Sequence, residues 1–151
     1  MIGNIGVDLT SSNVELAFLC KSSLHVICNQ IRENNSTALT EEDVNLLYTL
    51  FGDILFKALE LLDKDSIELI TITNSQRKYF LVEDQGFYYT LYKHIPFCKC
   101  DQFRKSVDDN KVKNICSHVL ACELSLALCS YHCTSMDKFV VQPLSDMEDE
   151  F

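Results

Sequence analysis

Two closely spaced pairs of metal-ligand residues constrain this chain more than any other feature of its sequence. Cys98 and Cys100 are separated by one residue, and Cys116 and His118 repeat that spacing after fifteen intervening residues. Three thiolates and one imidazole are a common tetrahedral ligand set for structural zinc, with no position left for water. Two pairs at loop distance are also more specific than a single C-x-C pair. The sequence therefore predicts one structural Zn²⁺ ion held by these four side chains, and no catalytic metal.

The segments that carry the two pairs indicate how the pairs converge. Residues 87–97 are rich in aromatic and β-branched side chains, so a strand is expected there, and alternation along it directs both cysteines of the first pair to one side. Residues 116–128 have a helical composition, which places the second pair at a helix start. Ala121 lies three residues after His118 on the same helix face. A small side chain there lets a neighbouring element approach the metal ligands.

The complete pattern, C-x-C, fifteen residues, C-x-H-x-x-A, resembles the SWIM zinc finger, a strand-strand-helix metal module. Its alanine-extended form resembles that of the SWIM-domain subunits of Shu-type recombination complexes. Residues 50–70 and 75–79 are similar to the segments that precede the finger in that family, and the resemblance covers about residues 44–130. It covers little of the first forty residues.

The resemblance implies a non-catalytic adaptor in the nucleus. Such an adaptor pairs with a recombinase-paralogue, ATPase-like subunit and supports assembly or stability of the recombinase filament in homologous recombination and DNA double-strand break repair, including meiosis. The resemblance also implies that Ala121 and the neighbouring helix face contact the partner, with an indirect or weak contact to DNA.

Charge leaves a second interpretation open, in which the finger binds nucleic acid directly. The net charge of −9 disfavours a protein that coats nucleic acid by electrostatics, but residues 77–113 carry a net charge of +3 and the remainder −12. The candidates for phosphate contacts are the basic residues of the finger loop. These are Arg104, Lys105, Lys111 and Lys113. A third interpretation is a redox protein that uses Cys98 and Cys100 as a dithiol.

Other function classes find little support. No apolar run approaches the roughly twenty residues of a membrane span, and the N-terminus lacks the basic start of a signal peptide. We therefore expect a reducing intracellular compartment, where eight cysteines are metal ligands or core thiols more often than disulfides. The four glycines cannot form a phosphate loop of the G-x-x-x-x-G-K type, so any ATP use would come from a partner. No small-molecule substrate is expected.

The overall pattern predicts an α+β fold in one domain at residues 11–142. The finger is expected at about 79–131, a flexible N-terminus at 1–10 and an acidic flexible tail at 143–151. The fold would contain two N-terminal helices, a small antiparallel three-stranded sheet, and the strand-strand-helix finger with a C-terminal helix. The expected bounds are about 13–31 and 40–62 for the N-terminal helices, 66–73, 78–84 and 87–97 for the strands, and 117–131 for the last helix.

Two details of the N-terminal helices are left open. Apolar residues at three- and four-residue steps form one seam on the first helix, which either packs on its own domain or docks a partner. Thr40 and Asp43 have the spacing of a capping box that opens the second helix. Gly52 within that helix costs about 1 kcal/mol relative to alanine. It marks either a close crossing or a break.

Cysteines outside the four-residue pattern have two interpretations. Cys129, His132 and Cys133 follow helical i, i+3, i+4 spacing and could form a partial second metal site. A fourth ligand is not evident, which favours core or surface thiols. Cys122 is likewise expected to be a core or surface thiol.

Overall fold

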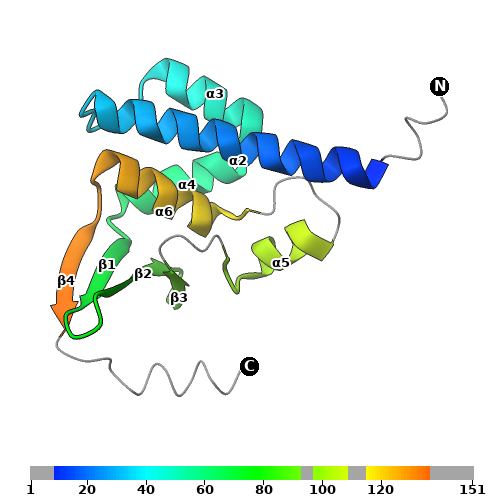
Figure 1. Ribbon diagram of the computed structural model, residues 1–151. Coiled ribbons are helices and arrows are strands. Elements are labelled where there is room, and N and C mark those ends of the chain that lie inside the picture. The colour runs from blue at the N-terminus through cyan, green and yellow to red at the C-terminus, as the bar shows by residue number, and fades with distance from the viewer. Residues whose placement is uncertain (1–8, 93–96, 109–114, 137–151) are drawn as a thin grey trace, which may run out of the picture.

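A computed structural model describes residues 9–92, 97–108 and 115–136, and Figure 1 shows how their elements are arranged. The helices are α2 (Leu9–Glu33), α3 (Glu41–Phe51), α4 (Ile54–Asp63), α5 (Asp101–Asp108) and α6 (Ser117–Leu128), and the strands are β1 (Ile67–Ile72), β2 (Arg77–Asp84), β3 (Phe87–Tyr92) and β4 (His132–Met136). Helices α2, α3, α4 and α6 gather beside the sheet, and α5 stands outside this group. The predicted α+β class is confirmed.

The expected second helix is two helices, because the chain turns at Gly52. Thr40 caps α3: its hydroxyl accepts a hydrogen bond from the Asp43 backbone N–H at 3.0 Å, and the Asp43 carboxylate accepts one from the Thr40 N–H at 3.1 Å. Gly52 then adopts a φ of 69° and a ψ of −142°, a conformation that is costly for residues with a Cβ. The prediction of two N-terminal helices is therefore wrong by one, and Gly52 marks a break.

The sheet has four strands in the order β3-β2-β1-β4, not three. The predicted antiparallel strands β1, β2 and β3 are confirmed, but β4 adds to the far edge of β1 in parallel. Its sequence, HCTSM, is short and mostly polar. The strand is held by backbone pairing with β1 and by a hydrogen bond from Thr134 to the Glu68 carboxylate. It lacks the runs of apolar, aromatic and β-branched residues that the other three strands contain.

Helix α6 ends at Leu128, three residues before its predicted end. Cys129 takes the left-handed conformation with a φ of 55°, and the Ser130 N–H donates to the Ser125 carbonyl at 2.9 Å. This geometry closes the helix in the way glycine usually does. The last described element is consequently a strand, and the expected C-terminal helix is the finger helix itself.

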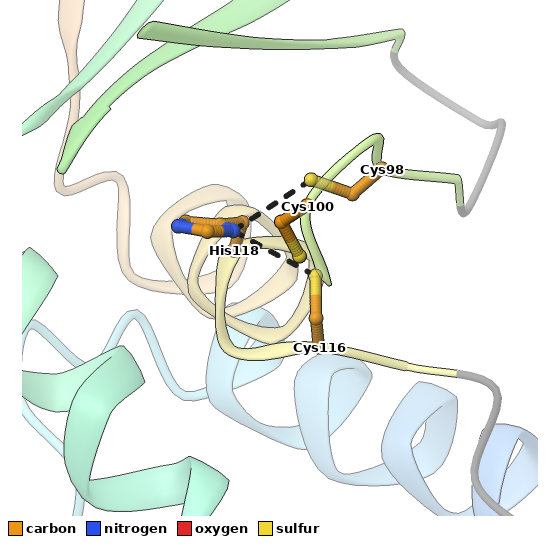
Figure 2. Close-up of side chains that lie close together, drawn as sticks. All are labelled: Cys98, Cys100, Cys116 and His118. Carbon is orange, nitrogen blue, oxygen red and sulfur yellow. Dashed lines mark hydrogen bonds between the residues drawn. The ribbon is translucent and has the colours of Figure 1, made fainter. Parts of the chain in front are cut away.

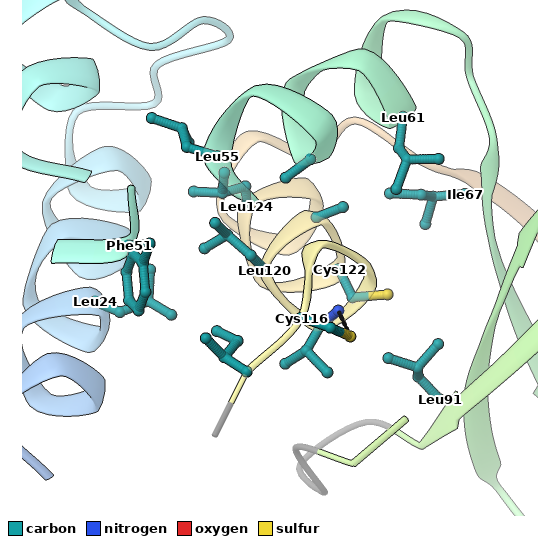
Figure 3. Packing of buried hydrophobic residues seen from close by; sticks show 14 of the residues in the cluster. Leu24, Phe51, Leu55, Leu61, Ile67, Leu91, Cys116, Leu120, Cys122 and Leu124 are labelled. Atoms are coloured by element: carbon teal, nitrogen blue, oxygen red, sulfur yellow. Dashed lines mark hydrogen bonds between the residues drawn. The ribbon is translucent and has the colours of Figure 1, made fainter. Parts of the chain in front are cut away.

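Helix α6 forms the centre of the core. It contacts α4 and α2, and its residues are buried almost all round, as expected for a helix enclosed by other elements. Leu120 and Leu124 have no exposed surface. Figure 3 shows them between side chains of the N-terminal helices and of the sheet. The labelled neighbours include Leu24, Phe51, Leu55, Leu61, Ile67 and Leu91.

The predicted flexible ends lie largely outside the described residues. Helix α2 begins at Leu9, so only the last two residues of the 1–10 segment are described, and the 143–151 tail is not. Within the described ranges, no helix combines the length and the hydropathy that a membrane crossing requires.

Candidate metal centre

The four predicted ligands converge on one point at the start of α6 (Figure 2). Cys98 and Cys100 come from the segment between β3 and α5, Cys116 is the N-cap residue of α6, and His118 lies in its first turn. The prediction for the second pair is confirmed. The prediction that a strand carries the first pair is wrong, because β3 ends at Tyr92 and both cysteines lie in irregular backbone.

Two of the sulfur atoms also accept backbone hydrogen bonds at helix starts. The Phe103 N–H donates to the Cys100 sulfur at 3.3 Å, and the Val119 N–H donates to the Cys116 sulfur at 3.5 Å. The first N–H groups of a helix lack carbonyl partners within the helix and favour negative charge. Helices α5 and α6 therefore direct their N-termini at thiolates, which helps to hold sulfur in its anionic, metal-binding form.

The separations between the side chains fit a tetrahedral zinc ion. Bonds of about 2.3 Å to sulfur and about 2.0 Å to nitrogen set an S···N separation of about 3.5 Å. The Nδ1 atom of His118 lies 3.6 Å from the Cys98 sulfur and 3.9 Å from the Cys116 sulfur. One donor atom from each of the four residues lies within 4.8 Å of the others. These residues form a site for one structural zinc ion.

Burial gives the site its structural character. The exposed fraction of the residue is 2% for Cys98, 5% for Cys100, 0% for Cys116 and 5% for His118. Thiolates this deeply buried need a compensating cation, and a bound Zn²⁺ supplies one. Because the protein provides all four ligands, no coordination position is left for water or a substrate.

A second layer of contacts surrounds His118, and no local sequence pattern predicts it. Asp84 Oδ2 lies 2.8 Å from His118 Nε2, and the Tyr89 ring stacks on the imidazole with 4.3 Å between ring centroids. The Gln102 side-chain carbonyl accepts a hydrogen bond from the Ser117 N–H at 2.8 Å. Asp84 begins an Asp-Gln-Gly turn, where an aspartate is common, so the sequence around it gives no sign of a role beside the metal site. Only the fold places it beside His118.

Contacts within the cluster shift the pKa values of Cys100, Cys116 and His118. Hydrogen bonds with Cys116 and Cys98 lower the pKa of the Cys100 thiol, and hydrogen bonds with Cys100 and Cys98 raise the pKa of the Cys116 thiol. Burial lowers the pKa of His118, but hydrogen bonds with Cys100, Cys98 and Asp84 outweigh it and raise that pKa to about 10. The cluster thus shares protons that a metal ion must displace.

The other predicted site residues are scattered. Ala121 is buried with 0% exposure, so its methyl group packs in the core and a partner contact at this position stays a prediction. Arg104 and Lys105 are exposed on α5, and Arg104 pairs with Asp101 on the same helix. Lys111 and Lys113 lie outside the described residues.

The partial second metal site lacks the geometry proposed for it. Cys129, His132 and Cys133 follow the end of α6 rather than lying on it, so helical spacing does not bring them together. Among the residues the structure describes, the four-ligand cluster is the one group of this kind found. Cys129 and Cys133 are exposed thiols, whereas Cys122 is buried in the core.

The β2–β3 hairpin, the buried Cys3His cluster and the helix that follows form a zinc-finger-type metal centre, and their arrangement resembles that of SWIM zinc fingers. Comparison with curated proteins leads to a particular relative: the chain resembles zinc finger SWIM domain-containing protein 7. The mouse protein is 31% identical over 94 residues and the human protein 32% identical over 90 residues. The Dictyostelium discoideum homolog is 32% identical over 93 residues.

These alignments cover part of each protein. They span 60 to 62% of this chain and 60 to 64% of the relatives, which is less than two thirds of the relatives' length. No family model matches the chain, and no solved structure matches it significantly. The relatives are named for a zinc finger and not for a catalytic activity.

Proposed function

We propose that this chain is a non-catalytic, zinc-stabilised adaptor of a Shu-type complex. It acts in the nucleus and supports recombinase filament assembly or stability in homologous recombination and double-strand break repair, including meiosis. The resemblance to zinc finger SWIM domain-containing protein 7 supports this role. The observation that carries the proposal is the buried four-ligand cluster, because a centre with every position filled by protein serves architecture rather than chemistry.

The position of the zinc centre explains how it serves an adaptor. It ties the segment before α5 to the first turn of α6, and α6 is the helix around which α2 and α4 pack. A structural zinc site contributes an apparent free energy of about 10 kcal/mol or more, which exceeds the stability of many domains. Loss of zinc would therefore disturb the core and any surface built on it.

Exposed apolar side chains support a protein partner. Tyr48 on α3 and Phe56 on α4 are two of them, and the centroids of their rings lie 5.3 Å apart. On and beyond β3, Phe87 and Tyr88 are each 68% exposed and Phe97 is 52% exposed. Scattered exposed hydrophobics are common, but grouped aromatic residues are typical of interaction surfaces. The partner we propose is a recombinase-paralogue, ATPase-like subunit, since this chain has no phosphate loop of its own.

Depletion in cells that express the chain tests the proposed role. Depletion should lower the number of recombinase foci after double-strand breaks, and wild-type protein should restore them. Cys116→Ser should fail to restore them because it removes a zinc ligand. Cys133→Ser, which changes an exposed cysteine outside the cluster, is the matched control and should restore them fully.

Affinity capture of the tagged chain is the second part of this test. A recombinase-paralogue ATPase should be recovered with wild type and with Cys133→Ser, and lost with Cys116→Ser. Unchanged foci after depletion, or capture without any ATPase of this class, would contradict the proposed function.

A further inference from the structure

Asp84 connects the zinc centre to helix α4. It is the last residue of β2, and its side chain is 15% exposed. One carboxylate oxygen, Oδ2, lies 2.8 Å from His118 Nε2, and the other, Oδ1, lies 3.1 Å from Lys57 Nζ. Three elements that are distant in sequence thus meet at one carboxylate.

The Asp84 contact selects which nitrogen of His118 faces the metal. A neutral imidazole carries one N–H, so one ring nitrogen donates a hydrogen bond and the other offers a lone pair. An ionised carboxylate can only accept a hydrogen bond, so in the neutral, metal-binding imidazole this contact fixes the N–H on Nε2 and leaves the lone pair on Nδ1. Nδ1 is also the atom that lies 3.6 Å from the Cys98 sulfur, on the side of the other ligands.

Two further contacts restrict this arrangement. The Tyr89 ring is stacked on the imidazole with an angle of 25° between the planes, so it blocks one face of the His118 ring. Lys57 engages the second oxygen of Asp84 and also contacts Glu60 on its own helix at 3.2 Å. The ammonium group therefore favours an ionised Asp84 at this position.

We propose that Asp84 is the positioning residue of the zinc centre, held in place by Lys57. It keeps the proton of His118 on Nε2 and directs Nδ1 toward the metal. Carboxylates that hydrogen-bond to metal-bound histidines commonly fix the ring and raise its basicity as a ligand. The inference concerns zinc affinity and does not depend on the proposed role in recombination.

The first experiment uses the zinc-loaded wild-type protein. Long-range ¹H–¹⁵N correlation spectra of histidine rings should show His118 protonated at Nε2 and metal-bound at Nδ1. Metal bound at Nε2 would overturn the inference. This measurement needs no variant and therefore stands even where a substitution prevents folding.

The second experiment measures zinc affinity by chelator competition. Asp84→Ala should lower the affinity by about 10- to 100-fold, the usual effect of removing such a partner. Asp84→Asn should have a smaller effect because its amide oxygen still accepts from Nε2. At saturating zinc, the His118 Nε2 proton should exchange with water faster in Asp84→Ala than in wild type.

Glu60→Ala is the matched control, because Glu60 contacts the same lysine but not His118. It should leave both the zinc affinity and the Nε2 proton exchange unchanged. An unchanged affinity in Asp84→Ala, or an equal loss in Glu60→Ala, would overturn the inference.

Discussion

The sulfur of Cys98 lies 3.6 Å from Nδ1 of His118, although the two residues are twenty positions apart in the chain. The unfolded chain does not hold them at this distance. Zinc binding and folding of the finger are therefore coupled.

Removing one ligand should remove the metal and the finger structure together. We expect one zinc per chain in wild type and in Cys133→Ser, and substantially less than one in Cys116→Ser. Far-UV circular dichroism should show lost structure in Cys116→Ser and in chelated wild type, because the site contributes about 10 kcal/mol or more. Elemental analysis by mass spectrometry measures the stoichiometry. Structure that survives chelation unchanged would contradict this prediction.

Zinc affinity should fall as the solution is acidified from about pH 8 to about pH 6. The pKa of His118 is raised to about 10 and that of Cys116 is raised above its ordinary value, so both groups hold protons at neutral pH. Zinc must displace those protons, which makes acid oppose binding by about tenfold per pH unit for each proton released. Calorimetry in two buffers of different ionisation enthalpy counts the protons. A binding enthalpy that is the same in both buffers would mean that no protons are released and would contradict this prediction.

Truncating Leu124 at the centre of α6 should destabilise the zinc-loaded chain by about 2 to 5 kcal/mol, since it removes transfer free energy and leaves a cavity. Leu124 has no exposed surface, whereas Leu19 on α2 is 56% exposed. Leu19→Ala is therefore the control and should change stability by no more than about 0.5 kcal/mol. Urea unfolding at fixed zinc concentration compares Leu124→Ala with this control. Equal midpoints would show that α6 is not packed as described.

Replacing Gly52 should destabilise the turn between α3 and α4. A Cβ at a φ of 69° and a ψ of −142° costs on the order of 1 to 3 kcal/mol. Asn45→Ala, an exposed substitution within α3, should be neutral or slightly stabilising because alanine is the better helix former. Thermal unfolding of Gly52→Ala and Asn45→Ala distinguishes the two effects. A Gly52→Ala chain as stable as wild type would mean that α3 and α4 can form one continuous helix.

The isolated chain should bind DNA weakly or not at all at physiological salt. Its net charge is −9, and one of its exposed finger cations, Arg104, is paired with Asp101. Reversing the charges of Arg104, Lys105, Lys111 and Lys113 together should therefore change little in a fluorescence anisotropy titration. Tight binding that weakens steeply with salt and disappears in the charge-reversed variant would instead favour the direct nucleic-acid interpretation.

Local spacing was sufficient to predict the ligands and several elements. Cys98, Cys100, Cys116 and His118 were identifiable because few other roles require these residue types in two such pairs. The capping box of Thr40 and Asp43 could also be predicted from the sequence, because its two partners lie three residues apart. Strands β1 and β2 lie close to the ranges expected for them, 66–73 and 78–84.

Tertiary structure decided the features that depend on distant neighbours. β4 carries no apolar pattern of its own and exists because the edge of β1 offers backbone partners. Asp84 is an ordinary turn residue in sequence, but folding brings it to His118, 34 positions away, and to Lys57. The family resemblance implies a partner contact at Ala121, yet α6 is enclosed and buries this residue. The sequence by itself determined which atoms can bind zinc, because ligand chemistry is a property of each side chain. Their orientation and surroundings arise from packing between elements, which only the folded chain specifies.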